Sequence, residues 1–184
     1  VNTTDFVVLK HNITLNVTDA VKVYGQVEKI NVTLEFADAT GNVTIYINET
    51  EFKDVPIANG KASIEVSGFK VGNYTINVIY DGDRKYNGNT TLGNLTVNKG
   101  KLPMVIVPHD IFFLQREIIQ IYANVSGDTE IVDVYINETY IDNDYFDDGY
   151  AEVTKNDLAP GHYIAKAYYR GDDYYEPGWV SAPF

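Results

Sequence analysis

The 184-residue sequence contains no cysteine, which excludes a disulfide framework, a zinc finger and thiol catalysis. It also lacks long apolar runs. The longest, such as MVIV at 104–107, fall far short of the roughly 20 residues that a membrane-spanning helix needs. No signal peptide is visible, so we expect any export or anchoring segment to have been removed or to lie outside this sequence. These absences predict no direct membrane insertion of this segment.

Positive charge is scarce, since 14 Lys and Arg stand against 26 Asp and Glu, giving a net charge of −12. Nucleic acids and anionic membranes are polyanions, so this balance argues against both as partners. The deficit is uneven, with 8 basic against 11 acidic residues in 1–98 and 6 against 15 in 99–184. The second half of the chain is therefore the acidic one.

Enzyme motifs are missing as well. The sequence has no G-x-S-x-G, no H-E-x-x-H and no phosphate-binding loop, and its three histidines have no metal-ligand spacing. Carboxylate pairs of the glycosidase kind stay open, although most acidic residues fall in turns or on solvent-facing strand positions. We predict that the chain is not an enzyme and holds no cofactor and no metal.

What the sequence does contain is an internal repeat. The stretch VTIYINETEF at 43–52 is answered by VDVYINETYI at 132–141, a spacing of 89 residues. Between 43 and 86, 14 of 44 positions are identical to their counterparts without a gap. The fold to derive is therefore that of one unit. We predict two domains, residues 1–98 and 99–184.

Apolar and polar residues alternate along most of each unit, which is the period of half-buried strands. About seven short strands separated by turn signals predict an all-β fold of two tandem immunoglobulin-like, Greek-key β-sandwiches. The expected strands are 12–18, 30–36, 43–48, 51–57, 61–67, 73–80 and 90–98, then 102–108, 116–125, 131–137, 139–145, 150–155, 162–169 and 179–184. The second unit stops early at Phe184, which suggests a fragment of a longer array or an edge completed by a neighbour.

The segments FKVGNY (69–74) and LAPGHY (158–163) resemble the tyrosine corner of Greek-key sandwiches. In that motif a tyrosine hydroxyl bonds back to the backbone of the preceding loop. Tyr74 and Tyr163 are the predicted corner residues, the alternative being ordinary strand tyrosines.

Asparagine is disfavoured in strands, yet this chain has 17, of which 11 begin an N-x-[ST] sequon for N-linked glycan. Nearly all of them alternate with the apolar residues of their strands, so they are predicted to face outward, where a glycan fits. The alternative is a compositional bias of a solvated face. Glycosylation would imply an exported protein. The predicted acceptors are Asn2, Asn12, Asn16, Asn31, Asn42, Asn48, Asn73, Asn89, Asn94, Asn124 and Asn137.

The segments NVTIYINETEF, NGKASIEVSGFKVGNY and GNYTINVIYDGDRKYNG resemble tandem immunoglobulin-like repeats of adhesin-like cell-surface proteins of methanogenic archaea. The second unit departs from the pattern where Asp157 replaces Gly68, but it keeps YYRGDDYY. The resemblance covers essentially the whole chain. It implies the sandwich fold and an extracellular, cell-surface location, and it is weak for the ligand, since such repeats mostly serve as spacers and displays.

Three local groups of residues are candidate binding sites. Arg170-Gly171-Asp172 matches an integrin-binding tripeptide, but the repeat explains its Gly and Asp as turn residues. The acidic stretch 142–149 is a weak calcium candidate through Asp142, Asp144, Asp147 and Asp148, although it lacks EF-hand spacing. Three aromatic residues exceed what the repeat requires and form a candidate recognition patch, the alternative being a surface with no partner. They are Tyr168, Tyr174 and Trp179.

These observations predict a non-enzymatic, glycosylated surface module of an adhesin or stalk. The predicted partners are neighbouring immunoglobulin-like repeats of the same or identical chains, and a protein or glycan on another cell. One alternative is self-assembly into a filament or lattice through edge strands. The other is a carbohydrate-binding module that uses Trp179 and nearby tyrosines.

Overall fold

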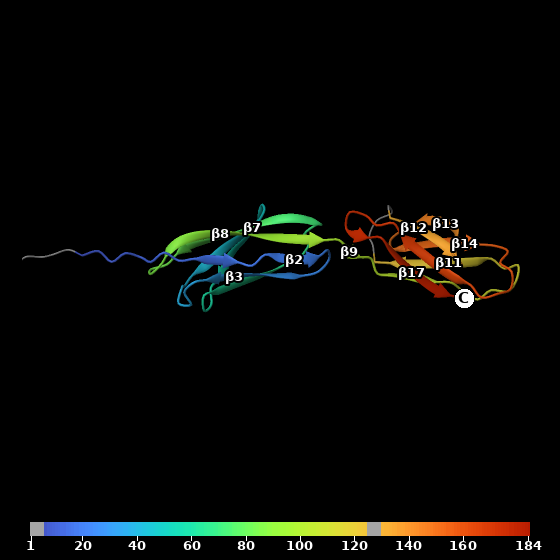
Figure 1. Cartoon of the computed structure of the whole chain (residues 1–184), viewed down its shortest axis with the longest axis horizontal. Coiled ribbons are helices and arrows are strands. Elements are labelled where there is room, and N and C mark those ends of the chain that lie inside the picture. The colour runs from blue at the N-terminus through green and yellow to red at the C-terminus, as the bar shows by residue number, and fades with distance from the viewer. Residues whose placement is uncertain (1–5, 125–129) are drawn as a thin grey trace, which may run out of the picture. The chain divides into compact units, whose positions relative to one another are not determined.

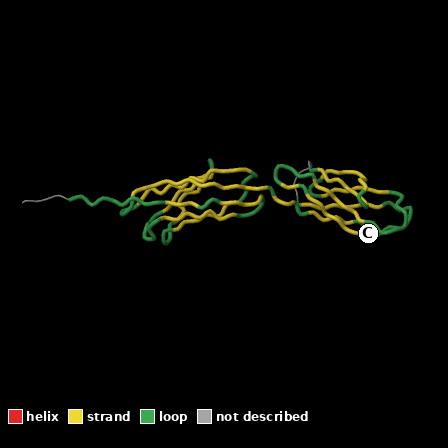
Figure 2. The backbone as a smooth tube through the Cα atoms, viewed as in Figure 1, coloured by secondary structure: helices red, strands yellow, loops and turns green. Residues whose placement is uncertain are grey.

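The computed structural model describes residues 6–124 and 130–184, and the chain divides into two compact units, Val1–Asn98 and Lys99–Phe184. The described residues form strands joined by turns and loops, without a helix (Figure 2). The all-β class predicted from the alternation is therefore confirmed.

The first unit packs a three-stranded sheet, in the order β1-β3-β6, against a five-stranded sheet, β2-β8-β7-β4-β5 (Figure 1). All pairings are antiparallel except that of β2 with β8. The strands are β1 (Leu15–Val17), β2 (Ala20–Val23), β3 (Glu28–Leu34), β4 (Asn42–Ile47), β5 (Thr50–Pro56), β6 (Lys61–Val66), β7 (Gly72–Gly82) and β8 (Asn87–Asn98).

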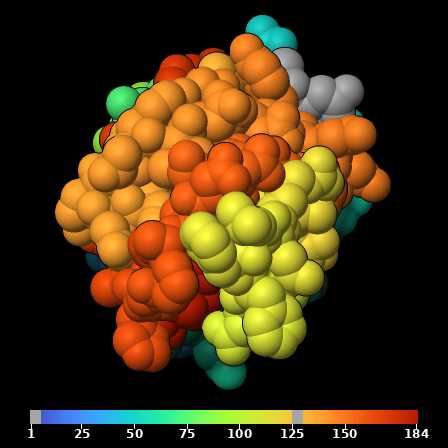
Figure 3. Space-filling view, turned by 90° about the vertical axis from the view of Figure 1, so that its right-hand side faces the viewer, coloured from blue at the N-terminus to red at the C-terminus, as the bar shows by residue number. Residues whose placement is uncertain are grey.

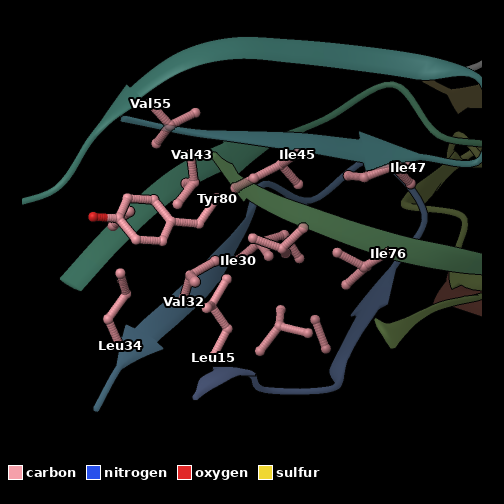
Figure 4. Close-up of a cluster of buried hydrophobic side chains, with 14 of the residues drawn as sticks. Leu15, Ile30, Val32, Leu34, Val43, Ile45, Ile47, Val55, Ile76 and Tyr80 are labelled. Carbon is pink, nitrogen blue, oxygen red and sulfur yellow. The ribbon is translucent and has the colours of Figure 1, made fainter. Parts of the chain in front are cut away.

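The core of the first unit follows directly from the alternation of its strands. On β3, Ile30 and Val32 are buried while Asn31 between them is exposed, and β4 buries Ile45 and Ile47 in the same way. Figure 4 shows these side chains projecting between the two sheets. Each fully buried aliphatic side chain contributes about 1.5–3 kcal/mol, so the alternating phase fixes which face of each strand turns inward.

The second unit repeats the plan with the sheets β10-β11-β14 and β13-β12-β15-β17 and a short parallel pair, β9 with β16. Four strands lie 89 residues after their counterparts without any shift, since β11, β12, β13 and β14 match β3, β4, β5 and β6. The strands are β9 (Gly100–Lys101), β10 (Met104–Val107), β11 (Glu117–Ala123), β12 (Ile131–Ile136), β13 (Thr139–Tyr145), β14 (Tyr150–Lys155), β15 (Ile164–Tyr169), β16 (Tyr175–Glu176) and β17 (Gly178–Pro183).

The sequence missed three short strands. The predicted strand 12–18 corresponds to β1 alone, after which the chain crosses to the other sheet as β2 and pairs in parallel with β8. The two-residue strands β9 and β16 were also not expected. A strand of two to four residues is too short to show the alternation of apolar and polar residues. Parallel partners are also not joined by a tight hairpin turn, so no turn sequence marks their pairing. With this strand order, both units are immunoglobulin-like β-sandwiches.

Candidate functional surface

The ten described sequon asparagines are all exposed, and Asn2 lies outside the described residues. Eight of the ten belong to the first unit, so possible glycan positions are concentrated there. An exposed Asn side chain is the geometry that attachment of an N-linked glycan requires. The ten are Asn12, Asn16, Asn31, Asn42, Asn48, Asn73, Asn89 and Asn94 in the first unit and Asn124 and Asn137 in the second.

Some of these asparagines also have a structural role. Asn48 and Asn137, which directly follow β4 and β12, adopt the left-handed conformation, with φ of 49° and 46°. Their Oδ1 atoms each accept a 2.9 Å hydrogen bond from a backbone amide, of Thr75 and Ile164 respectively. Asparagine tolerates this conformation better than most residues. The turn therefore explains why the same YINET segment occurs in both units, independently of any glycan.

Asn89 makes a much shorter hydrogen bond through its amide nitrogen than Asn31, Asn42 and Asn94, whose Nδ2 atoms donate at 3.4 Å. Its Nδ2 donates a 2.6 Å hydrogen bond to the carbonyl oxygen of Ile13. That nitrogen is the atom to which a glycan would be attached, so this sequon would have to break an existing contact to be modified.

Both proposed corner tyrosines bond to the backbone four residues upstream. The Tyr74 hydroxyl donates to the carbonyl of Lys70 at 2.9 Å, and the Tyr163 hydroxyl donates to the carbonyl of Ala159 at 2.6 Å. This is the tyrosine-corner geometry, and it ties each loop to the strand that follows it. Asp157 takes the place of Gly68 in the second of these loops and adopts the same left-handed conformation, with φ of 60° against 74°.

The Asp-Gly-Asp turn at the end of β7 is held by its second aspartate. The carboxylate of Asp83 accepts hydrogen bonds from the backbone amides of Thr40, Lys85 and Tyr86, at 2.7 to 2.9 Å. Burial alone would raise the pKa of this carboxyl, but these amides outweigh it and hold the pKa far below its usual range. Gly82 has φ of 88°, and a Cβ there would lie 2.6 Å from the carbonyl oxygen of Tyr86, so the turn requires glycine.

The corresponding turn of the second unit contains Arg170-Gly171-Asp172, and its two charged groups are both engaged. The Asp172 carboxylate accepts hydrogen bonds from the amides of Tyr174 and Tyr175, each at 2.6 Å. The Arg170 guanidinium forms a two-pronged pair with the buried carboxylate of Asp133, at 2.8 and 2.6 Å. This bonding raises the pKa of Arg170. Neither side chain is presented as an integrin ligand would be.

The four aspartates considered for calcium are not gathered into a metal-binding group in the described part of the chain. Asp144 accepts a 2.9 Å hydrogen bond from the amide of Glu152 and another from its neighbour Tyr145. Asp142 likewise accepts from the amide of Asn143. Asp148 has a left-handed φ of 47° in the turn before β14. These carboxylates and turns stabilise the hairpin rather than converging on one point.

The outer surface of the sheet β13-β12-β15-β17 carries a continuous group of aromatic rings. Trp179 on β17 lies 4.5 Å from Tyr168 on β15 and 5.3 Å from Tyr135 on β12, and Tyr135 lies 5.6 Å from Tyr140 on β13, between ring centroids. Trp179 is 58% exposed and Tyr140 48% exposed. We call these four residues the aromatic face.

Charged pairs lie on the same sheet as the aromatic face. Arg170, directly after β15, is paired with Asp133 on β12. Lys166 on β15 is bonded to Glu138, which lies in the turn after β12. Rings flanked by fixed hydrogen-bonding groups are suited to stack on a sugar or peptide and orient its polar atoms.

The aromatic face is specific to the second unit. The counterparts of its members in the first unit are Tyr46, Glu51, Ile79 and Thr90. Only Tyr46 is aromatic, and it donates a hydrogen bond to Glu51. The two units thus share a backbone but differ at the place where the second unit gathers its rings.

Sequence reasoning found two members of this face and missed two. Tyr168 and Trp179 pair directly across β15 and β17. Tyr174 belongs to the turn between β15 and β16 instead. Tyr135 and Tyr140 were not joined to the predicted patch, although the segment 140–146 is visibly rich in aromatic residues, because side chains on distant strands become neighbours only through the strand order.

Residues 6–124 and 130–184 contain no helix that is long and apolar enough to cross a membrane.

Residues 12–98 match the family model of the bacterial Ig-like domain (group 3). The match runs from Asn12 to the end of β8, so it supports the immunoglobulin-like fold of the first unit. The repeat spacing and the strand order extend the fold to the second unit. No curated protein matches the chain.

Several solved structures are similar over most of the chain. Fibronectin(III)-like modules of Clostridium thermocellum CbhA share 17% identity over 92% of each chain, with a TM-score of 0.37. A chimeric titin Z1Z2 carrying a decorin peptide shares 12% identity over 96% of this chain and 97% of that one, with a TM-score of 0.41. The titin I9–I11 tandem shares 10% identity, covering 93% of this chain and 64% of that one, with a TM-score of 0.39.

Proposed function

We propose that the chain is a non-enzymatic, glycosylated module of an extracellular surface protein of the adhesin or stalk type, as in the methanogen proteins that it resembles. Its first unit carries most of the glycans. Its second unit presents the aromatic face to a partner. The action is mechanical and geometric, because folded sandwiches extend reach while glycans shield the surface between contacts.

The observation that carries this proposal is the exposure of every described sequon asparagine. A glycan could not be accommodated on the inward phase of a strand, and none of the ten sequon asparagines lies there. The match of residues 12–98 to the bacterial Ig-like domain (group 3) is in keeping with a surface module.

Mass spectrometry of glycopeptides from native material tests the proposal. We expect glycan on several exposed asparagines of the first unit and none on Asn89, whose Nδ2 is already bonded to Ile13. Replacing Thr33 by alanine removes the Asn31 sequon without touching the asparagine and should abolish only the Asn31 glycan. Native protein whose intact mass equals the bare polypeptide mass would contradict the glycosylated module.

The aromatic face favours one second function, recognition of a carbohydrate. Stacking of a sugar ring on Trp or Tyr depends on exposed rings held in place, and Trp179 is both 58% exposed and flanked by Tyr135 and Tyr168. Trp179→Ala should abolish binding on a glycan array. Tyr122→Ala is the control, because Tyr122 is a 44% exposed tyrosine on the opposite sheet of the same unit. If Trp179→Ala bound glycans as well as Tyr122→Ala does, the proposal of carbohydrate recognition would be wrong.

A further inference from the structure

The first unit has a hollow of about 700 Å³ at the end where β4 turns into β5. The residues that line it come from two segments, 47–52 and 67–74, which contain the β4–β5 turn and the loop between β6 and β7. Its volume lies within the range of pockets that hold small molecules, about 300–1,000 Å³. We call this hollow the turn pocket.

Three half-buried aromatic rings form the apolar part of the turn pocket. They belong to Phe52, Phe69 and Tyr74. The rings of Phe69 and Tyr74 lie edge to face with 5.1 Å between centroids, and the Tyr74 hydroxyl is bonded to the carbonyl of Lys70. These contacts hold two of the three rings in place. Fixed aromatic rings offer a flat surface on which the apolar face of a sugar can pack.

All three residues of the Asn48 sequon, Asn48, Glu49 and Thr50, line the same pocket. Asn48 is exposed, and its backbone amide donates a 2.9 Å hydrogen bond to the carbonyl of Thr75. Its Oδ1 accepts a second 2.9 Å hydrogen bond, from the Thr75 amide. This bond orients the side-chain amide and therefore also fixes Nδ2, the atom to which a glycan would be attached. A sugar attached at Nδ2 starts at the wall of the turn pocket.

Two charged side chains add polar groups to the lining. Glu49 supplies a hydrogen-bond acceptor and Lys70 a donor, and both types of group can bind sugar hydroxyls. In the second unit the counterpart of Glu49 is Glu138, which is already bonded to Lys166. The turn pocket thus combines rings with polar groups, as binding sites for small polar molecules do.

The second unit has the same turn with a different lining. Asn137 repeats the left-handed φ of Asn48 and the hydrogen bond of its Oδ1. Figure 3 looks onto this end of the second unit, where the orange segment of the β12–β13 hairpin lies beside the orange-red segment before β15. Two of the three rings and the lysine are replaced there. The counterparts of Phe52, Phe69 and Lys70 are Ile141, Leu158 and Ala159.

We propose that Asn48 carries an N-linked glycan whose first sugar packs into the turn pocket and stabilises the first unit. This inference rests on the proposed glycosylation of the chain. The sugar is covalently attached, so its contact with the rings is intramolecular and has a high effective concentration. The pocket exists only in the folded state, so the contact favours folding. The same sugar on Asn137 lacks two of the three rings and gives no such gain.

The test compares the full chain with and without sugar. One sample is secreted from a eukaryotic host and trimmed enzymatically to the first N-acetylglucosamine of each glycan, and the other is the unglycosylated chain from a bacterial host. Mass spectrometry of glycopeptides gives the occupancy of Asn48 and Asn137, and calorimetry gives the melting temperature of each unit. We expect the sugar on Asn48 to raise the melting temperature of the first unit by about 4 °C or more.

Two matched variants assign the effect to one sugar. Thr50→Ala removes the Asn48 sequon but keeps the asparagine, so the glycosylated first unit should lose that rise. The unglycosylated Thr50→Ala chain gives the effect of the substitution itself, which is subtracted. Thr139→Ala removes the Asn137 sequon in the same way and is the control. After the same subtraction it should leave the melting temperature of the second unit unchanged.

A double substitution gives the turn pocket the residues that the second unit has at these positions. Phe52→Ile with Phe69→Leu keeps the lining apolar but removes two rings. We expect the sugar on Asn48 to produce a much smaller rise in this variant, again relative to its own unglycosylated form.

The outcomes separate this inference from the glycosylated module itself. A sugar on Asn48 that leaves the melting temperature unchanged, or a rise that the double variant keeps in full, would overturn the packing and leave the proposed function intact. Glycan on other sequons but not on Asn48 would do the same. A chain without glycan on any sequon would contradict the proposed function as well.

Discussion

At the scale of single residues, the clearest anomaly is a carboxylate in the core of the second unit. Glu117 is fully buried. Its Oε1 accepts a 2.6 Å hydrogen bond from the amide of His109, while its Oε2 has no partner. In the first unit its counterpart Glu28 is close to the buried Lys22, whose charge acts on it favourably. The second unit has Ile111 in the place of Lys22, so the basic group beside its buried acid is the His109 imidazole, with Nδ1 3.8 Å from Oε1, in place of a lysine.

Burial raises the pKa of Glu117 above its usual value, although the amide of His109 partly opposes this. The folded state therefore binds a proton more tightly than the unfolded chain, in which the pKa of a glutamate is about 4.3. The contribution of Glu117 to stability is consequently present below that pH and is lost as pH rises through the folded pKa. We expect Glu117→Gln to remove this loss of stability.

The measurement is urea unfolding at several pH values, followed by the fluorescence of the single tryptophan, Trp179, which reports on the second unit. Exposed Glu176→Gln is the control and should leave the pH profile as in the wild type. We expect the free energy of unfolding of the second unit to fall between pH 4 and 7 in the wild type, relative to the Glu117→Gln variant. The same pH profile in both proteins would contradict the raised pKa of Glu117.

At the scale of strands and turns, the sequence predicts those strands that are long enough to show the alternation of apolar and polar residues. The long strands of both units were found because one face of each is buried, and burial imposes alternation on the sequence. The switch of the first strand from β1 to β2 was missed, since four residues show no period and the parallel partner lies at the end of β8. Tyr135 and Tyr140 were missed for a related reason, because side chains become neighbours only through the strand order.

The tyrosine corners belong to this scale, since each one fixes a loop to a strand. Tyr74→Phe and Tyr163→Phe remove one hydroxyl-to-carbonyl hydrogen bond each while keeping the ring. We expect each change to lower the free energy of unfolding of its own unit by about 1 kcal/mol. Denaturant unfolding measures the change. Tyr145→Phe, at a 52% exposed ring, is the control, and an equally large loss there would show that the corner bond is not the cause.

At the scale of the whole molecule, the two units have separate hydrophobic cores. The buried cluster that contains Ile45 is drawn only from residues of the first unit, and the cluster that contains Val134 only from the second. Two units of about 90 residues, each with its own core, can unfold in two separate cooperative transitions.

Ile45→Ala tests this independence, because Ile45 is 0% exposed in the first core. We expect a loss of about 2–5 kcal/mol in the first unit and an unchanged transition in the second. Val134→Ala should destabilise the second unit and leave the transition of the first unchanged. Calorimetry of the full chain resolves the transitions, with Trp179 fluorescence identifying that of the second unit. A single transition that shifts as a whole in either variant would show that the two units unfold together.

The shared register of the two units makes the aromatic face transferable. Tyr46 pairs with Glu51 and Ile79 pairs with Thr90, as Tyr135 pairs with Tyr140 and Tyr168 with Trp179 in the second unit. Since Tyr46 is already in place, Glu51→Tyr, Ile79→Tyr and Thr90→Trp would graft the whole ring cluster onto the first sandwich. Three substitutions would thus give the chain a second copy of the proposed binding face, and avidity for its partner would rise without any new backbone.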